Sequence, residues 1–247
     1  MGNGKAGPIA GIIAGIFAVV AVSISLYRPG AVTLEERAAV LLDKPVTDAS
    51  DAAEQIKEIE TFSAADDFAQ LPDETREQMR KRLEALQAYL QFERELDRIT
   101  PPQQIRGIDQ LARVRKRLQE LHPPREFAAS WEDSQGVRRR RLWLEELSTL
   151  KETIEKTQQQ YEALCADADR VLKNSQAADL PGRAKKVLDK ARSVPNPDEH
   201  ATRHLPRSNN LTYATVFAFR DVRDAYDLWQ KKQKKLQAIV DKFGKTP

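Results

Sequence analysis

Hydrophobic residues follow two different patterns along this chain. The first is an uninterrupted stretch of twenty residues, from Pro8 to Tyr27, without a charged side chain. As a helix it would extend about 30 Å, which matches the hydrocarbon thickness of a bilayer. Beyond it, apolar residues recur at spacings of three and four among charged ones, which is typical of amphipathic helices in a bundle. The sequence therefore predicts an all-α protein with one N-terminal transmembrane helix and an elongated, coiled-coil-like helical bundle.

A cleaved signal peptide is the alternative interpretation of the apolar stretch. Lys5 precedes the stretch as a positive charge, and the small residues Ala21 and Ser23 could flank a cleavage site. The stretch is longer than the roughly 7 to 15 apolar residues of a signal peptide. Tyr27 and Arg28 also follow it as the interfacial residues of an anchor do. We expect a single-pass membrane protein, and the balance of Lys and Arg leaves the side of its soluble region open.

Small residues line one face of the predicted anchor. Gly7, Gly11 and Gly15 repeat at four-residue spacing. Such a repeat lets two helix backbones approach closely in lipid, where packing rather than the hydrophobic effect drives association. The sequence thus predicts transmembrane association through these glycines.

Capping signals and prolines divide the remaining chain into helices. Thr33 and Glu36 form a capping box, and Pro45 ends the helix that it opens. The same reasoning predicts helices over 33–44, 51–70, 72–100, 105–121, 136–174, 181–193 and 219–243. We expect three regions: the anchor at 1–29, a membrane-proximal helical region at 30–124, and a distal helical hairpin at 125–247.

Two heptad seams stand out in the distal region. The first is formed by Trp143, Leu147, Leu150, Ile154, Thr157, Tyr161, Leu164, Ala168 and Val171; the second by Phe219, Val222, Tyr226, Trp229, Gln233, Leu236, Val240 and Phe243. Seams of this kind pack by knobs into holes. We expect the second helix to return antiparallel to the first within one chain, and a parallel homodimer stays open.

Charge is distributed unevenly along the chain. Residues 30–75 contain twelve acids and three bases, a net charge of −9, whereas the whole chain carries +3. Basic clusters follow at 80–82, 115–117, 138–141 and 231–235. No nucleic-acid-binding motif accompanies these clusters, so solvated helix faces are the simpler interpretation and nucleic acid is an unlikely partner.

Side chains capable of chemistry are few. His200 and His204 are four residues apart and are weak candidates for metal ligands, but the sequence offers no paired cysteine beside them. Cys165 is the single cysteine and flanks a seam position. The sequence contains no phosphate-binding loop and no nucleophile elbow. We expect neither a cofactor nor an enzymatic activity.

These features together predict a function in assembly. We expect a membrane-anchored scaffold or adaptor that acts by protein–protein interaction, self-associates as a homo-oligomer and binds a protein partner that the sequence does not identify. The alternative is a membrane-tethered sensor that binds nucleic acid or another ligand through its basic helices.

Overall fold

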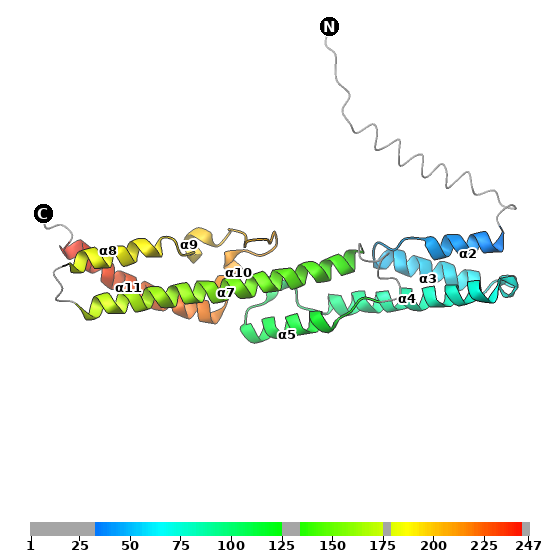
Figure 1. Ribbon diagram of the computed structural model, residues 1–247, viewed down its shortest axis with the longest axis horizontal. Helices are drawn as coiled ribbons and strands as arrows, with labels where there is room; N and C mark the ends of the chain where they lie inside the picture. The colour runs from blue at the N-terminus through cyan, green and yellow to red at the C-terminus, as the bar shows by residue number, and fades with distance from the viewer. Residues whose placement is uncertain (1–32, 125–133, 175–178, 244–247) are drawn as a thin grey trace, which may run out of the picture. The chain divides into compact units, whose positions relative to one another are not determined.

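The computed structural model describes residues 33–124, 134–174 and 179–243 (Figure 1). Within these ranges the chain is helical and contains no strand. The extended pairing seen there is a single antiparallel bridge between His204 and Thr212. The predicted all-α helical bundle is therefore confirmed for the part of the chain that the structure describes.

The predicted anchor and its glycines, Gly7, Gly11 and Gly15, lie outside the described residues. None of the helices within the described ranges combines the length and the hydropathy that a bilayer crossing requires.

The chain folds as two compact units that divide within helix α4 (Asp73–Asp97), between Ala88 and Tyr89. The first unit contains α2 (Leu34–Asp43), α3 (Ala49–Ser63), the 3₁₀ turn η1 (Phe68–Gln70) and the first part of α4. Its described core consists of Ala38, Val46, Ala52, Ile59, Phe62, Leu71, Met79, Ala85 and Leu86.

Local signals explain where the helices of the first unit begin and end. The Thr33 hydroxyl accepts from the Glu36 amide at 3.2 Å, and the Glu36 carboxylate accepts from the Thr33 amide at 2.8 Å. Asp48 likewise accepts two backbone amides at the start of α3. The prediction that this helix reaches residue 70 is wrong. It ends at Ser63, and the chain turns so that the Phe68 ring meets the Phe62 ring edge-on at 5.9 Å.

The second unit contains the end of α4, the 3₁₀ turn η2 (Pro102–Gln104) and six further α-helices among its described residues. These are α5 (Ile108–Glu120), α7 (Gln135–Lys173), α8 (Leu180–Ala191), α9 (Pro197–His200), α10 (Tyr213–Phe217) and α11 (Arg220–Phe243). Figure 1 shows α8 and α11 beside the C-terminal part of α7. The helices of this unit agree closely with the predicted 105–121, 136–174, 181–193 and 219–243.

The direction of α11 differs from the prediction. Tyr226 of α11 packs on Tyr161 of α7, with ring centroids 5.3 Å apart, and further along both helices Lys232 pairs with Asp169. The two helices therefore run parallel, and the predicted antiparallel return is wrong. The reason lies in the connection, because α8 runs back along α7 and brings Lys190 to Asp167, 2.7 Å away. The chain has thus returned before α11 begins.

Candidate interaction surfaces

The seam residues form the core of the second unit. Leu147, Leu150, Ile154, Tyr161, Leu164, Val222, Trp229 and Leu236 are buried, while Trp143, Tyr226 and Val240 are half-buried. Packing of α7 and α11 on each other and on α5, α8 and α10 within one chain accounts for this burial. A role of these residues in binding a partner stays a prediction, and exposed surfaces have to be sought elsewhere.

The buried carboxylate of Glu93, a residue of α4, lies against the first turn of α7. Glu93 accepts from the Tyr89 hydroxyl at 2.7 Å and from the Arg139 guanidinium at 2.8 Å. Helix N-termini favour nearby anions, so this placement of Glu93 against the first turn of α7 is stabilising. Burial raises the pKa of Tyr89 to about 12, and the bond to Glu93 acts in the same direction.

Two of the four consecutive arginines at 138–141 form hydrogen bonds and ion pairs within the second unit. Arg139 bonds Glu93 and also Asp97 at 2.8 Å, and its guanidinium lies 5.7 Å from the centre of the Trp143 ring. The Arg140 Nε donates to the Leu118 carbonyl at the end of α5, at 2.9 Å. These contacts give two of the arginines a role in joining α4 and α5 to α7.

A second buried carboxylate holds the loop between α9 and α10. Glu146 is 1% exposed, and its Oε1 accepts from the Ser208 hydroxyl and the Asn210 amide, both at 2.9 Å. The Ser208 oxygen in turn accepts the backbone amides of Asn210 and Leu211. Glu146 Oε2 has no hydrogen-bond partner among the described residues. The loop is thereby fixed to α7 beside Arg207, which has a φ of 58°.

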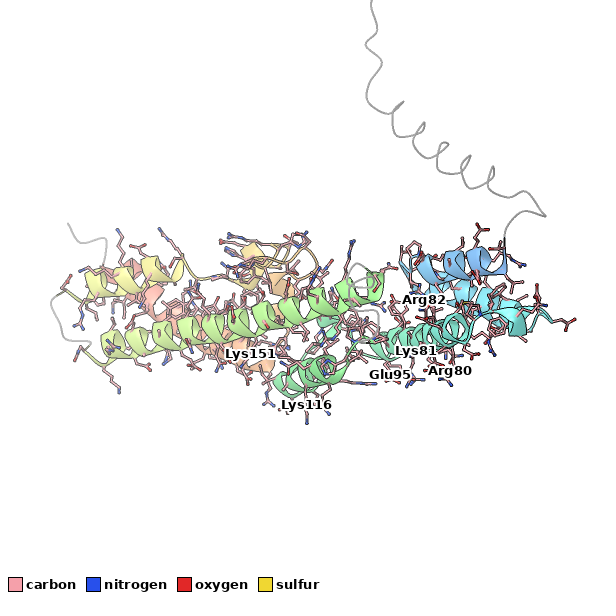
Figure 2. The ribbon with its side chains drawn as sticks, turned by 45° about the vertical axis from the view of Figure 1, so that its right-hand side comes forward. Arg80, Lys81, Arg82, Glu95, Lys116 and Lys151 are labelled. Carbon is pink, nitrogen blue, oxygen red and sulfur yellow. The ribbon has the colours of Figure 1, made fainter. Side chains whose placement is uncertain are left out.

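In the first unit a buried arginine joins α4 to the loop after α2. Arg82 is 3% exposed and donates to the Lys44 carbonyl at 2.6 Å and to the Gln55 amide oxygen at 3.0 Å. Gln55 donates to the Lys44 and Pro45 carbonyls. Arg80 and Lys81, labelled with Arg82 in Figure 2, are exposed. The basic cluster at 80–82 thus contains one structural residue and two exposed ones.

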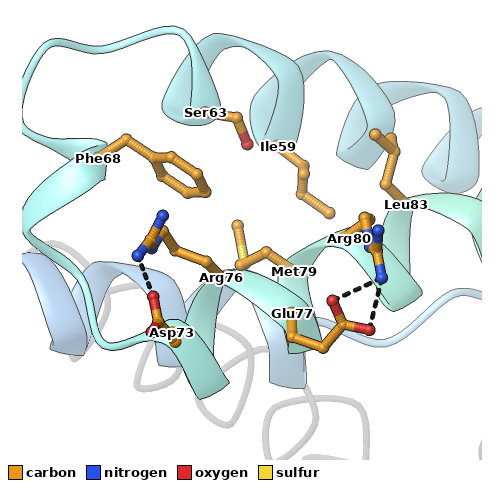
Figure 3. Close-up of a pocket in the computed structure, with 9 residues that line it drawn as sticks. All are labelled: Ile59, Ser63, Phe68, Asp73, Arg76, Glu77, Met79, Arg80 and Leu83. Carbon is orange, nitrogen blue, oxygen red and sulfur yellow. Dashed lines mark hydrogen bonds and ion pairs between the residues drawn. The ribbon is translucent and has the colours of Figure 1, made fainter.

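An open groove of about 550 Å³ lies in the first unit between α3 and α4 (Figure 3). Ile59, Phe68, Met79 and Leu83 supply its apolar surface. Its charged residues are paired along α4: Arg76 with Asp73, and Arg80 with Glu77 at 2.7 Å. Because each cation already has an acid beside it, the groove carries little unbalanced charge.

A second groove of about 440 Å³ lies between α5 and α7. Ile108, Leu111 and Ala112 form its apolar part, and Arg115, Lys116 and Lys151 are its cations. Among the described lining residues, Glu155 is the acid, 3.6 Å from Lys151. This groove combines an apolar floor with excess positive charge.

Exposed lysines gather on α8 and α11. Lys185, Lys186, Lys231, Lys234 and Lys235 are exposed, and no described acid lies within ion-pair distance of them. The neighbouring Lys190 and Lys232 are paired with Asp167 and Asp169. The two helices pack on one another, so their unpaired cations make this region of the second unit basic.

The candidate metal ligands are placed separately. His200 ends α9, where its Nδ1 accepts from the Asn196 amide at 3.4 Å, whereas His204 is exposed in the bridge to Thr212. No group of three or more metal-ligating side chains occurs in the described ranges. Cys165 is buried beside the second seam, and burial raises the pKa of its thiol.

Several polar residues at these sites were missed from the sequence. Arg82, Glu93 and Glu146 are buried, although charged side chains normally favour solvent. One signal was present: Met79, Arg82, Leu86, Tyr89, Glu93 and Leu96 recur at spacings of three and four along the buried face of α4. The apolar positions alone give the series Met79, Leu83, Leu86 and Leu90, of which Met79 and Leu86 are buried but Leu83 and Leu90 are half-buried.

Comparison with known proteins gives no relative for this chain. No family model, no curated protein and no solved structure matches it.

Proposed function

We propose that this chain is a single-pass membrane-anchored helical scaffold that acts by binding proteins, including further copies of itself. The apolar stretch from Pro8 to Tyr27 supports the anchor, and it ends six residues before the first helix cap at Thr33. Helix α2 would then begin close to the membrane.

The observation that carries the proposal is the separation of charge between helices. Residues 30–75 carry −9, whereas α8 and α11 expose five lysines that form no ion pair with a described acid. Complementary surface charge steers encounter and fixes which surfaces meet, more than it adds affinity. A chain with both signs on its surface can bind acidic or basic partners and other copies of itself.

The mass of the full chain in detergent tests this function. Light scattering should give more than one copy per particle or a stable complex with a second protein. Replacing Gly11 and Gly15 with Ile should lower the number of copies, because Ile keeps the helices apart. A particle with one copy and no partner would contradict the scaffold.

The exposed lysines also favour a second candidate, a membrane-tethered sensor that binds nucleic acid or another polyanion. Phosphate contacts make such binding fall steeply with salt. Retention of the chain on nucleic acid should then be lost when Lys231, Lys234 and Lys235 are changed to Gln. The matched control is Lys57, Lys81 and Lys156 changed to Gln, three exposed lysines on other helices. Equal retention by both variants would exclude α11 as the binding element.

A further inference from the structure

The outward face of α2 combines acids with an exposed apolar side chain. Ala38 is fully buried, so it marks the inner face of this helix. Glu36, Val40 and Asp43 follow one another at spacings of four and three, which places them on one stripe on the opposite side. Val40 is 67% exposed, the largest exposed fraction among the described large apolar residues.

The groove between α5 and α7 has the complementary character. Ile108 is 43% exposed at its apolar end, and Ala112 follows one turn later on α5. Arg115 and Lys116 continue the same helix, and Lys151 faces the groove from α7 (Figure 2). The nearest acids, Glu120 and Glu155, lie 3.8 and 3.6 Å from the two lysines, so these pairs are loose and exposed. Exposed pairs of this kind are worth little and are readily exchanged.

We propose that this groove binds the outward face of α2 from a second copy of the chain. Val40 would rest on the apolar floor at Ile108 and Ala112, and Glu36 and Asp43 would meet the cations of the rim. A helix in an apolar groove is a recurring mode of protein recognition. The opposite signs of charge, and the exposed apolar side chain that each surface carries beside its charges, favour α2 as the occupant.

The proposal rests on the proposed function and names a surface for its self-association. Each copy carries one stripe and one groove, so the contact is heterologous and can link copies in sequence. Anchoring in one membrane would raise the effective concentration of such copies, as tethering does in general.

Two full-length variants test this contact. The stripe variant carries Val40→Lys and Asp43→Lys, and the groove variant carries Lys116→Glu and Lys151→Glu. All four side chains are exposed, so the helices themselves should be retained. Two differently tagged copies of the same variant should co-precipitate about tenfold less than wild type, since like charges then meet in the contact. A stripe copy mixed with a groove copy should restore co-precipitation, because each supplies the surface that the other lacks.

Lys57→Glu with Lys156→Glu, on α3 and α7, is the control with the same change of charge as the groove variant. It should co-precipitate like wild type, because both lysines are exposed and lie outside the stripe, the groove lining and the basic surface of α8 and α11. All pairs are also measured with Gly11→Ile and Gly15→Ile, which removes association through the predicted glycine face. Unchanged co-precipitation of both variants would overturn this contact and leave a self-associating scaffold standing. Loss without restoration in the mixed pair would overturn α2 as the occupant. A wild-type chain that binds neither itself nor any protein would overturn the proposed function as well.

Discussion

Gly136 lies against the carboxylate of Glu93, so closely that a methyl group at Gly136 would overlap Glu93 Oε1. The carboxylate has little freedom to move, because Tyr89 and Arg139 hold its two oxygens. The absence of a side chain at Gly136 is therefore what lets α4 and α7 meet through a buried acid.

Gly136→Ala should destabilise the second unit by about 1–3 kcal/mol, because moving Glu93 breaks hydrogen bonds to a buried charged group. Alanine favours a helix by about 1 kcal/mol over glycine, which offsets only part of this cost. Gly182→Ala in α8 is the matched control, since its methyl group would meet the exposed Asp179 side chain, which can turn away. Denaturant unfolding should show a loss for the first variant and no loss for the second. Equal midpoints would contradict the tight contact.

Arg82→Met should destabilise the first unit by about 2–3 kcal/mol, because it leaves the Gln55 amide oxygen without its donor in a buried site and removes one of the two donors to the Lys44 carbonyl. Arg80→Met is the comparison on the same helix. Its ion pair with Glu77 is exposed and joins residues three apart, so its loss should change the stability little. Thermal unfolding of both variants measures the difference. A loss for Arg80→Met as large as that for Arg82→Met would contradict the account.

Tyr89 should make the stability of the second unit depend on alkaline pH. Its pKa is about 12 in the fold and about 10 in an unfolded chain, so the fold favours the protonated phenol. The resulting stability is complete below pH ~10 and is lost as the pH rises toward about 12. In Tyr89→Phe the free energy of unfolding should therefore fall less over this interval than in wild type. Burial also raises the pKa of Tyr161 and Tyr226, so part of the fall should remain. Identical pH profiles of the two proteins would refute this role of Tyr89.

Glu146→Gln and Glu146→Ala should have different effects on the stability of the second unit. The amide can keep both accepted hydrogen bonds through its single oxygen while it removes a charge that has no described counter-ion. Stability should thus stay within about 1 kcal/mol of wild type or rise. The alanine variant loses both bonds and leaves the Ser208 and Asn210 donors without their acceptor, which should cost about 2–4 kcal/mol. Protease cleavage in the loop between α9 and α10 should increase only in the alanine variant. Increased cleavage in both variants would contradict this, because it would show that the carboxylate charge itself holds the loop.

Much of the fold could be predicted from the sequence because strong local signals mark it. The capping box at Thr33, the prolines between helices and the seam on α7 place most helix ends within a few residues. The direction of α11 could not be predicted in this way, since heptad spacing is the same for parallel and antiparallel neighbours. It depends on α8 returning along α7, which is a property of packing over many residues.

The candidate surfaces were harder to predict for a related reason. Arg80 and Arg82 are two residues apart in the same basic cluster, yet one is exposed and the other is among the buried polar residues of the first unit. The difference follows from which side of α4 faces α2 and α3. Likewise, a charge count along the chain showed an excess of cations, but it could not separate Lys190 and Lys232, which are paired with acids, from the five exposed lysines of α8 and α11 that form no ion pair with a described acid.

Cross-linking in intact membranes tests the central claim most directly. Copies of the full chain labelled with heavy and light isotopes are expressed together, lysine–lysine links are formed, and mass spectrometry identifies the linked peptides. A scaffold of the kind proposed predicts links between heavy and light copies, links to a second protein, or both, with lysines of the second unit among the linked positions. Links found only within single copies would contradict it.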